Sequence, residues 1–536
     1  MINISYYKND VIYISNKLEN EDYYLEFIDN EEHHIVNIYP KKEITLKSFA
    51  LIQDFKFKKS DQVLVNGYQS WTDTREFNIN ESLKTIKMPS FISNKYKFKA
   101  YGDYSFKKTR KHVLHGYTYA YLKRDNIIQL YGSLNYQNAY LIINYDIKRN
   151  RIILESDCEN KILKDKFTLL NYCYLEGKVI ETQQLYFSKI GNSNHLKLRG
   201  YTSWYNYYQD INEEKIDNAL EGIDDSNYDI FQIDDGYETF VGDWLKIDQN
   251  KFPQGLSNIV KKIHNKNLKA GIWLAPFIVE EKSEIFNEHP DWIYKENNQI
   301  GYAGKNWSRQ VPLDINNKEV REYIKKCLNY YLELGFDFFK LDFLYAANLV
   351  KVKGQTRAET MYQMMSFIRN ILKDKLILGC GLPLESGFNL VDYCRIGPDV
   401  SLSFDDIFYM RLAHRERIST KITLLNTIYR YPMDKYVFRN DPDVYLLRDD
   451  NINLSNKQKE ALLKINFLCG ALYFTSDNVI NYNLEKRNLL FEASKLQDAI
   501  LTNIITKKEV IILEYMLNGK NEQLIYNFKK GVIENG

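Results

Sequence analysis

The chain has 536 residues, and its 72 Lys and Arg nearly balance its 70 Asp and Glu. A formal charge of +2 on a chain this long predicts neither a nucleic-acid partner nor a membrane partner. At roughly 150 residues per domain, the length indicates two to four domains.

The chain begins with "MINISYYKND", which has neither the basic region nor the apolar region of a secretory signal. Residues 1–195 then carry short runs rich in Tyr, Ile, Phe and Val, separated by turn residues, as in "DVIYISN" (Asp10–Asn16). Alternating apolar and polar residues with β-branched and aromatic enrichment are typical of antiparallel strands. Residues 1–195 are therefore predicted to form a large N-terminal β-sandwich.

From residue 196 the pattern changes to apolar strands that alternate with stretches typical of helices, such as 319–335 and 359–374. The eight candidate strands are residues 198–204, 228–236, 269–277, 336–343, 376–381, 393–399, 435–443 and 471–477. Eight strands in about 300 residues favour an α/β fold of the (β/α)8 TIM-barrel type over residues 196–497. Only 19 positions separate Cys380 from Asp399, so the crossover between them must be short. Residues 498–536 are predicted to form a small C-terminal β domain.

Several kinds of site are not indicated by the sequence. The six cysteines are scattered without a CxxC pair, which is typical of reduced thiols and predicts a cytoplasmic protein. There is no HExxH motif and no His/Cys cluster at metal spacing, so we expect no metal. There is no GxGxxG or GxxxxGK[ST] motif, and no run of about 18 apolar residues that would span a membrane. We therefore expect no cofactor, while the oligomeric state is left open.

Polar and aromatic side chains recur where the candidate barrel strands end. They are Trp204, Asp234, Asp235, Trp273, Lys340, Asp342, Cys380, Arg395, Asp399, Asp441, Asp443 and Asp477. The carboxyl ends of barrel strands converge on one face, where the active sites of this fold lie. Carboxylates with one Lys, one Arg and tryptophans fit glycoside hydrolysis, which needs two carboxyl groups at the scissile bond and polar groups for sugar hydroxyls.

Seven motifs, taken in order, make the chain resemble glycoside hydrolase family 36, the melibiase or α-galactosidase family. They are "NGYQSW" (66–71), "FQIDDGY" (231–237), "AGIWLAPF" (270–277), "FFKLDF" (338–343), "GCGLPL" (379–384), "RIGPD" (395–399) and "NDPD" (440–443). The resemblance extends over nearly the whole chain. It implies a retaining double displacement with Asp342 as the nucleophile and Asp399 as the general acid/base.

The same resemblance implies how the sugar is held. Asp234 and Asp235 are expected to bind the O4 and O6 hydroxyls, while Trp204 and Trp273 form walls of the pocket. Trp71 is expected to reach over from the sandwich, and Cys380 to line the side near O2. Lys340, which shares a strand face with Asp342, is expected to keep the nucleophile charged and to donate to a hydroxyl. Arg395 is expected to orient a hydroxyl or the acid.

Two departures from the family pattern limit the prediction. Leu341 stands where many relatives have the Trp of a "KWD" motif, and "GCGLPLESG" (379–387) replaces a "CxxGxGR"-like stretch. The second departure leaves the O2 side open, and with it the choice between an α-galactosidase and an α-N-acetylgalactosaminidase. A galactosyl transglycosylase of the same family is a third alternative.

Each residue also has a structural interpretation, and two other classes of protein compete. Asp235 is a candidate helix N-cap, Cys380 a small buried apolar residue, and Asp441, Asp443 and Asp477 are expected to be mainly structural. Lys340 is also a candidate Schiff-base lysine of an aldolase, and the barrel a candidate sugar-binding protein without activity. The sequence therefore predicts a cytoplasmic retaining α-galactosidase acting on small α-galactosides such as melibiose or raffinose.

Overall fold

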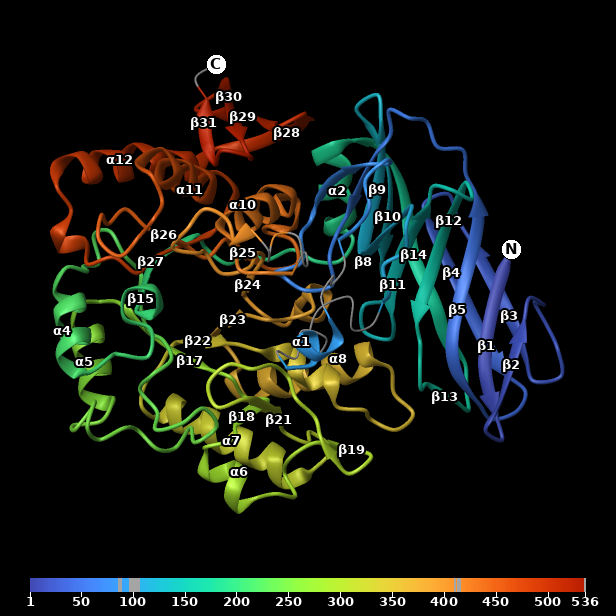
Figure 1. Ribbon diagram of the computed structural model, residues 1–536, viewed down its shortest axis with the longest axis horizontal. Helices are drawn as coiled ribbons and strands as arrows, with labels where there is room; N and C mark the ends of the chain where they lie inside the picture. The colour runs from blue at the N-terminus through green and yellow to red at the C-terminus, as the bar shows by residue number, and fades with distance from the viewer. Residues whose placement is uncertain (85–88, 96–106, 409–410, 412–415, 535–536) are drawn as a thin grey trace.

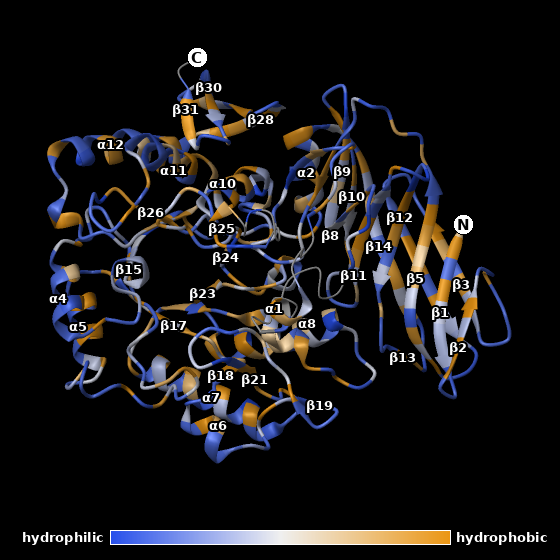
Figure 2. Ribbon diagram, in the orientation of Figure 1, coloured by the Kyte–Doolittle hydropathy of each residue, from blue (hydrophilic) through white to orange (hydrophobic). Residues whose placement is uncertain are grey.

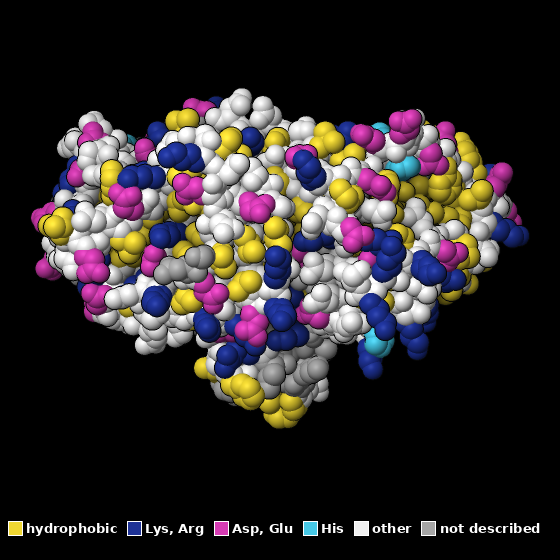
Figure 3. All heavy atoms as spheres, turned by 90° about the horizontal axis from the view of Figure 1, so that it is seen from above, with side chains coloured by type: hydrophobic (Ala, Val, Ile, Leu, Met, Phe, Trp, Pro, Cys, Tyr) yellow, Lys and Arg dark blue, Asp and Glu magenta, His cyan; other side chains and the backbone are white. Residues whose placement is uncertain are grey.

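Two large layered units stand side by side, with a small sheet beside one of them (Figure 1). The structure is a computed structural model, and it describes residues 1–84, 89–95, 107–408, 411 and 416–534. Within those residues, no helix is both long enough and apolar enough to cross a membrane. Figure 3 shows basic and acidic side chains interspersed over the face in view, as the near-zero formal charge leads one to expect.

The N-terminal unit is the predicted sandwich of two antiparallel sheets. The first sheet has the order β2 (Val11–Ser15), β1 (Ile2–Lys8), β5 (Ile44–Asp54), β12 (Arg151–Asp157), β11 (Tyr140–Asp146) and β8 (Val113–Tyr117), with β13 (Ile162–Leu163) beside β5. The second has the order β3 (Tyr23–Asp29), β4 (His33–Pro40), β14 (Phe167–Lys178), β10 (Ile127–Ser133), β9 (Tyr119–Arg124), β6 (Gln62–Val65) and β7 (Arg75–Asn78). In β12 buried and half-buried residues alternate, which gives the period of two of a strand with one face on a core. Helix α1 (Ser90–Lys95) follows β7, and α2 (Val179–Ser188) follows β14.

The second unit is the predicted barrel of parallel strands. Its sheet has the order β25 (Arg439–Asp441), β24 (Tyr393–Arg395), β23 (Leu376–Gly379), β22 (Phe338–Leu341), β17 (Lys269–Leu274), β16 (Ile230–Ile233), β15 (Leu198–Thr202), β27 (Leu472–Thr475) and β26 (Val444–Tyr445). Every pairing in it is parallel. All eight candidate strands of the sequence are present, each shorter than predicted.

The seventh barrel strand is split into two pieces. β25 pairs with β24 on one side, and β26 pairs with β27 on the other. Only Pro442 and Asp443 separate the two pieces, so this one segment joins both edges of the sheet and closes the barrel. Pro442 has no N–H to give to a ladder, and Asp443 has a φ of 75°, a conformation that strands do not use. The sequence predicted one strand over 435–443, and the break is the physical reason for the difference.

Helices cover the outside of the barrel. They are α4 (Glu213–Glu221), α5 (Ser257–Asn265), α7 (Lys318–Glu333), α8 (Arg357–Leu372), α10 (Thr420–Tyr429), α11 (Asn456–Cys469) and α12 (Leu484–Ser494). Figure 2 shows hydrophobic and hydrophilic residues on the same helices, as in α4 and α5. A capping box between Thr356 and Glu359 begins α8, in which Met361, Met364 and Met365 are buried. The short crossover from β23 to β24 contains the 3₁₀ turn η3 (Leu384–Gly387) and no α-helix.

Smaller elements complete the fold. Between β17 and α7 lie β18 (Ile278–Glu280), α6 (Glu284–Glu288), β19 (Lys295–Glu296), β20 (Gln299–Ile300) and β21 (Gln310–Pro312). Short helical turns are α3 (Trp204–Tyr207), η2 (Leu344–Leu349), η4 (Tyr431–Met433), η5 (Val479–Asn481) and η6 (Lys495–Asp498). The C-terminal sheet is antiparallel, in the order β28 (Ile500–Lys507), β29 (Val510–Leu517), β30 (Lys520–Asn527) and β31 (Val532–Glu534). The domain limits at residues 195 and 497 stay predictions, and they fall between the three groups of strands.

Candidate active site

Asp342 lies directly after β22 and is held on both oxygens. The indole Nε1 of Trp273 donates to Oδ2 at 3.2 Å, and the backbone N–H of Phe343 donates to Oδ1 at 2.7 Å. Burial raises the pKa of the Asp342 carboxyl above its ordinary value; the Lys340 ammonium opposes that rise, and the Asp399 carboxylate adds to it. Phe343 has a φ of 51°, which is uncommon for a bulky residue.

Asp399 lies four residues beyond the end of β24 and accepts from Arg395 Nη1 at 2.9 Å. Its side chain is 46% exposed, whereas the Arg395 side chain is 5% exposed. Arg395 also donates through Nε to Asp441 Oδ2 at 2.7 Å, and its Nη2 lies 2.8 Å from Asp443 Oδ1. One buried guanidinium therefore holds three carboxyl groups, of which only Asp399 is open to solvent.

Lys340 pairs with Asp234, and its Nζ lies 2.7 Å from Asp234 Oδ2. Thr202 Oγ1 and Gln232 Nε2 donate to the same oxygen, at 3.1 and 3.0 Å. Burial by itself raises the pKa of Asp234, but Lys340 together with the hydrogen bonds from Gln232 and the Asp235 N–H outweighs burial, and the pKa lies below its ordinary value. Asp234 also raises the pKa of Lys340 against the effect of burial. Lys340 therefore keeps its ammonium, which argues against the Schiff-base alternative, because that chemistry needs a neutral amine.

Asp235 is fixed by donors from two loops. Gln209 Nε2 lies 3.2 and 3.1 Å from its two oxygens, and Trp307 Nε1 donates to Oδ2 at 2.9 Å. The next α-helix, α5, begins only at Ser257, so Asp235 does not cap it. The buried Glu238 carboxyl lies beside Asp235, and burial together with the Asp235 charge raises the pKa of Glu238 well above its ordinary value.

A row of aromatic rings lies beside the Asp342 and Asp235 carboxyl groups. The ring centroids of Trp273 and Trp307 lie 6.1 Å apart, and those of Trp307 and Phe343 lie 5.4 Å apart. Phe343 is followed by Tyr345 at 6.3 Å, and Tyr345 by Trp71 at 5.5 Å. The structure thus places Trp71 against the barrel although it belongs to the N-terminal unit. Trp204 begins α3 directly after β15, with its ring edge-on to Tyr208 at 5.1 Å.

The loop that carries Trp71, residues 66–74, is clamped by two polar residues of the barrel. Asn426 in α10 donates to the carbonyls of Ser70 and Thr72 and accepts from the N–H of Thr74. Arg430 is fully buried, and its guanidinium donates to five oxygens of the loop. These acceptors are Asn66 Oδ1, Thr74 Oγ1 and the carbonyls of Gly67, Gln69 and Ser70.

Cys380 is 3% exposed and follows β23, with its N–H donating to Leu341 O at 2.8 Å. Burial raises the pKa of its thiol well above the ordinary value, so the group is a neutral thiol. The next residue, Gly381, packs closely against the segment that follows β22. A Cβ on Gly381 would lie 3.0 Å from Phe343 N and 3.3 Å from Asp342 Oδ1, so a side chain there would crowd the carboxylate.

Two residues near this site were not predicted from the sequence. Trp307 and Glu238 were not singled out; both lie outside the strand ends, and Trp307 lies in the insertion between β17 and α7. Asp441 and Asp443, which were expected to be mainly structural, contact Arg395 directly. Within the described ranges, the structure shows no group of three or more His, Cys, Asp or Glu that would suit a metal ion.

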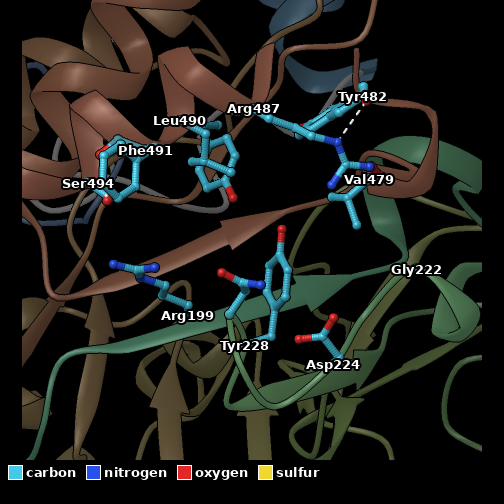
Figure 4. Close-up of a pocket in the computed structure, with 12 residues that line it drawn as sticks. Arg199, Gly222, Asp224, Tyr228, Val479, Tyr482, Arg487, Leu490, Phe491 and Ser494 are labelled. Atoms are coloured by element: carbon cyan, nitrogen blue, oxygen red, sulfur yellow. Dashed lines mark hydrogen bonds between the residues drawn. The ribbon is translucent and has the colours of Figure 1, made fainter. Parts of the chain in front are cut away.

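A separate cavity of about 190 Å³ lies away from these strand ends. Figure 4 shows Arg199, Tyr228 and Tyr482 around it, with Arg487 donating to the backbone oxygen of Tyr482. Arg199 stands at the amino-terminal part of β15, and Tyr228 precedes β16. The predicted catalytic and sugar-binding residues do not line this cavity.

Comparison with known proteins finds a family model and curated relatives that match part of the chain. The family model described as Melibiase matches residues 191–376. The α-galactosidase AgaA of Geobacillus stearothermophilus is 31% identical over 129 residues, which cover 23% of this chain and 17% of the relative. An Escherichia coli α-galactosidase is 29% identical over 175 residues, covering 31% of this chain and 24% of the relative. These matches therefore span about a fifth of the length of the curated relatives.

Solved structures extend the likeness to the whole fold. TtGalA, an α-galactosidase from Thermus thermophilus solved in complex with p-nitrophenyl α-D-galactopyranoside, has a TM-score of 0.72 at 21% identity, with 92% of this chain and 98% of that chain covered. The family 36 α-galactosidase AgaA has a TM-score of 0.59 at 13% identity, covering 92% of this chain and 72% of that chain. Residues 191–376 thus resemble the Melibiase family model, and the solved α-galactosidases share the fold of a barrel with an N-terminal sandwich.

Proposed function

We propose that this chain is a retaining α-galactosidase that removes terminal α-galactosyl residues from small oligosaccharides. The observation that carries the proposal is the pair of carboxyl groups at the ends of β22 and β24. Asp342 is held by the Trp273 indole and the Phe343 N–H, whereas Asp399 is half exposed and held by Arg395. The two lie near enough for the Asp399 charge to raise the pKa of Asp342.

In the proposed first step, a carboxylate oxygen of Asp342 attacks the anomeric carbon. The bond to the leaving oxygen breaks, and Asp399 gives that oxygen its proton. In the second step, Asp399 takes a proton from water, and the water oxygen displaces Asp342 from the anomeric carbon. Galactose leaves with its α configuration, and both carboxyl groups return to their starting states. The exposure of Asp399 suits a group that must meet both a leaving group and a water molecule.

Recognition of galactose is assigned to the two buried carboxylates after β16. Asp234 carries a full charge because Lys340 is paired with it, and a charge-assisted hydrogen bond to a hydroxyl contributes about 1.5–3 kcal/mol. Asp235 is oriented by Gln209 and Trp307. We assign O4 and O6 to these two residues, the walls to Trp204 and Trp273, and the cover to Trp71. Lys340 then acts mainly through Asp234 and adds a donor for a neighbouring hydroxyl.

The substrate class rests on what known relatives bind. The Thermus α-galactosidase was solved with p-nitrophenyl α-D-galactopyranoside and with stachyose, and a variant of the Geobacillus enzyme with raffinose. For the O2 side we propose galactose rather than N-acetylgalactosamine, following the galactosides bound in those relatives. A cytoplasmic location is part of the proposal, supported by six buried thiols.

The deciding experiment compares initial rates on p-nitrophenyl α-galactoside and p-nitrophenyl α-N-acetylgalactosaminide. A strong preference for the first supports the α-galactosidase, and a preference for the second replaces it with the α-N-acetylgalactosaminidase. Asp342→Ala is expected to abolish turnover in a folded protein. Asp399→Ala is expected to slow raffinose far more than the aryl galactoside, whose leaving group needs little protonation. NMR of the first-formed product should show the α anomer; a β anomer would exclude a retaining mechanism.

The main alternative to this proposal is a galactosyl transglycosylase, which transfers galactose to a sugar instead of to water. Product analysis with raffinose at high concentration distinguishes it, because a transferase would build longer oligosaccharides and release little galactose. Mainly free galactose supports hydrolysis. Binding of galactose without any turnover by the wild type would favour a sugar-binding barrel instead.

A further inference from the structure

The Asp443 side chain contacts two groups that hold Asp399 in place, the Arg395 guanidinium and the peptide after Asp399. Its Oδ1 lies 2.8 Å from Arg395 Nη2, and Arg395 Nη1 in turn donates to Asp399. Its Oδ2 accepts from the N–H of Val400 at 2.7 Å, which fixes the backbone directly after Asp399. The Tyr205 hydroxyl donates to the same Oδ2. One side chain therefore contacts both the guanidinium that holds the proposed acid and the peptide that follows it.

The charges in this cluster do not cancel. Arg395 brings one positive charge to Asp399, Asp441 and Asp443, and the latter two are 0% and 1% exposed. Asp441 is tied to Arg395 Nε and also accepts from the N–H of Asp443. Burying uncompensated charge is costly, so at least one of these carboxyl groups must have a strong tendency to take up a proton.

We propose that Asp443 is a positioning residue that sets the proton affinity of Asp399 through their shared partner Arg395. This inference rests on the proposed role of Asp399 as the general acid/base. Asp443 does not touch the substrate in this scheme; it acts on the strength of the ion pair between Arg395 and Asp399.

The split of the seventh strand explains why Asp443 can do this. An unbroken strand from 439 to 445 would place Asp441 and Asp443 on one face at regular spacing. Instead the break at Pro442 and the φ of 75° at Asp443 turn that residue out of the ladder, and its carboxyl reaches Val400 and Tyr205. The break thus gives Arg395 two buried carboxylates that approach different nitrogens of the same guanidinium.

Several charged groups face this pair and contribute to its titration. Burial raises the pKa of Asp443 to about 7; Arg395 opposes the rise, while Asp399 and Asp441 add to it. The Tyr205 hydrogen bond lowers it. Asp399 itself faces Arg395 on its own segment, Asp342 from β22, and Tyr205 and Tyr208 from α3 and its end.

The sign of the effect follows from these charges. When Asp443 is ionised, its negative charge offsets the positive charge of Arg395, so Asp399 holds its proton more strongly. When Asp443 is neutral, Arg395 stabilises the ionised form of Asp399, and Asp399 loses its proton at lower pH. Since protonated Asp399 is the proposed acid, kcat/KM should fall on the alkaline side at a pH that depends on Asp443.

The experiment uses the whole chain and the substrate raffinose, whose leaving group needs the acid. Asp443→Asn is expected to move the alkaline limb of kcat/KM to lower pH by about half a unit to one unit. Asn is tolerated at positive φ, so the substitution does not strain the backbone. Tyr205→Phe removes the hydroxyl that favours ionised Asp443, and it should move the limb in the same direction by less. At pH 8, kcat/KM on raffinose should fall about threefold to tenfold in Asp443→Asn, and by less than that on p-nitrophenyl α-galactoside.

A matched control is Asp61→Asn in the sandwich, because Asp61 is also a fully buried partner of an arginine, Arg124, at 2.7 Å. It should lower stability and leave the pH profile unchanged. An unshifted alkaline limb in both Asp443→Asn and Tyr205→Phe, with equal losses on the two substrates, would overturn the inference. If Asp443→Asn fails to fold, Tyr205→Phe alone decides. Failure of the proposed function has a different result, namely a wild type inactive on both galactosides or unaffected by Asp399→Ala.

Discussion

Lys340 and Asp234 form a buried ion pair that spans the inside of the barrel, with Nζ 2.7 Å from Oδ2. Lys340 comes from β22 and Asp234 from the end of β16, two strands away across β17. The pair explains why a lysine stands in the apolar run "FFKLDF": its ammonium neutralises the buried Asp234 carboxylate. Asp342, two residues further along the chain, instead accepts hydrogen bonds from the Trp273 indole and the Phe343 N–H.

Breaking this pair should cost both stability and sugar binding. Lys340→Met leaves Asp234 as an uncompensated buried charge, and the free energy of unfolding should fall by about 3–5 kcal/mol. The double variant Lys340→Met with Asp234→Asn should lose less free energy of unfolding than the sum of the two single changes, because no buried charge is then left without a partner. Urea titrations of the four proteins measure this coupling.

A control separates stability from binding in that experiment. Lys123 and Glu76 form a comparable buried pair in the sandwich, at 2.6 Å. Lys123→Met should lower stability without raising KM for p-nitrophenyl α-galactoside, whereas Lys340→Met should raise KM strongly. Strictly additive losses in the double variant would show that Lys340 and Asp234 do not support one another.

The proposed nucleophile should be a source of instability at neutral pH. Its pKa in the folded protein is raised, chiefly by burial, so the charged form is disfavoured by folding. For an acid with a raised folded-state pKa, the unfavourable contribution is present at neutral pH and vanishes once the pH falls below the unfolded-state value, about 3.9. Asp342→Asn should therefore be inactive and more stable than the wild type at pH 7, with the gain shrinking toward pH 4. Melting temperatures across this range test it, and a loss of stability at pH 7 would contradict it.

The link between the two large units should be sensitive to Asn426. This side chain makes three buried hydrogen bonds to the 66–74 loop, which carries Trp71. Asn426→Ala should lower the free energy of unfolding by about 2–4 kcal/mol, because loop groups are left unsatisfied. It should also raise KM more than it lowers kcat, since Trp71 is proposed to cover the sugar.

The neighbouring Thr427 supplies the control for that variant. It is fully buried, and its hydroxyl has no hydrogen-bond partner among the described residues. Thr427→Val keeps the shape and should leave KM and stability nearly unchanged. An Asn426→Ala protein with wild-type KM would mean that the 66–74 loop does not position a sugar-binding residue.

The barrel and the polar residues at its strand ends were predictable because burial leaves a local pattern. Runs such as "FFKL" and "LILG" are apolar throughout, as expected of parallel strands covered on both faces. Polar residues that interrupt or follow such runs are therefore conspicuous, and Asp342, Asp234 and Arg395 were found in this way. The family resemblance then implied a role for each, which spacing alone does not.

The partners of these residues were not predictable, because they depend on contacts across the barrel. Strand periodicity places Lys340 and Asp342 on one face, but it does not show that Asp234 lies closer to the ammonium. The break at Pro442 is a local departure from strand geometry, so a single strand was predicted where there are two. Trp307 lies in an irregular insertion, which has no period from which its side-chain direction follows.

Glu238 offers a test of one residue that the sequence did not indicate. It is buried beside Asp235, and one of its oxygens has no hydrogen-bond donor among the described residues. Burial and the Asp235 charge raise its pKa well above the ordinary value, so the wild type should lose stability as the pH rises through that pKa. Glu238→Gln mimics the protonated acid and removes this loss. Its stability relative to the wild type should therefore increase from pH 5 to pH 8.5, with activity retained.

Glu238→Ala is the matched comparison, because it removes the group that lies against Asp235. It should raise KM for p-nitrophenyl α-galactoside at every pH, since Asp235 then loses a neighbour that fixes its orientation. Urea midpoints at three pH values, with KM measured at each, separate the two variants. A Glu238→Gln protein whose stability relative to the wild type does not change with pH would show that Glu238 has the same protonation state in the folded and unfolded chains. In that case Glu238 and Asp235 would share no proton. The orientation of Asp235 would then depend on Gln209 and Trp307 alone.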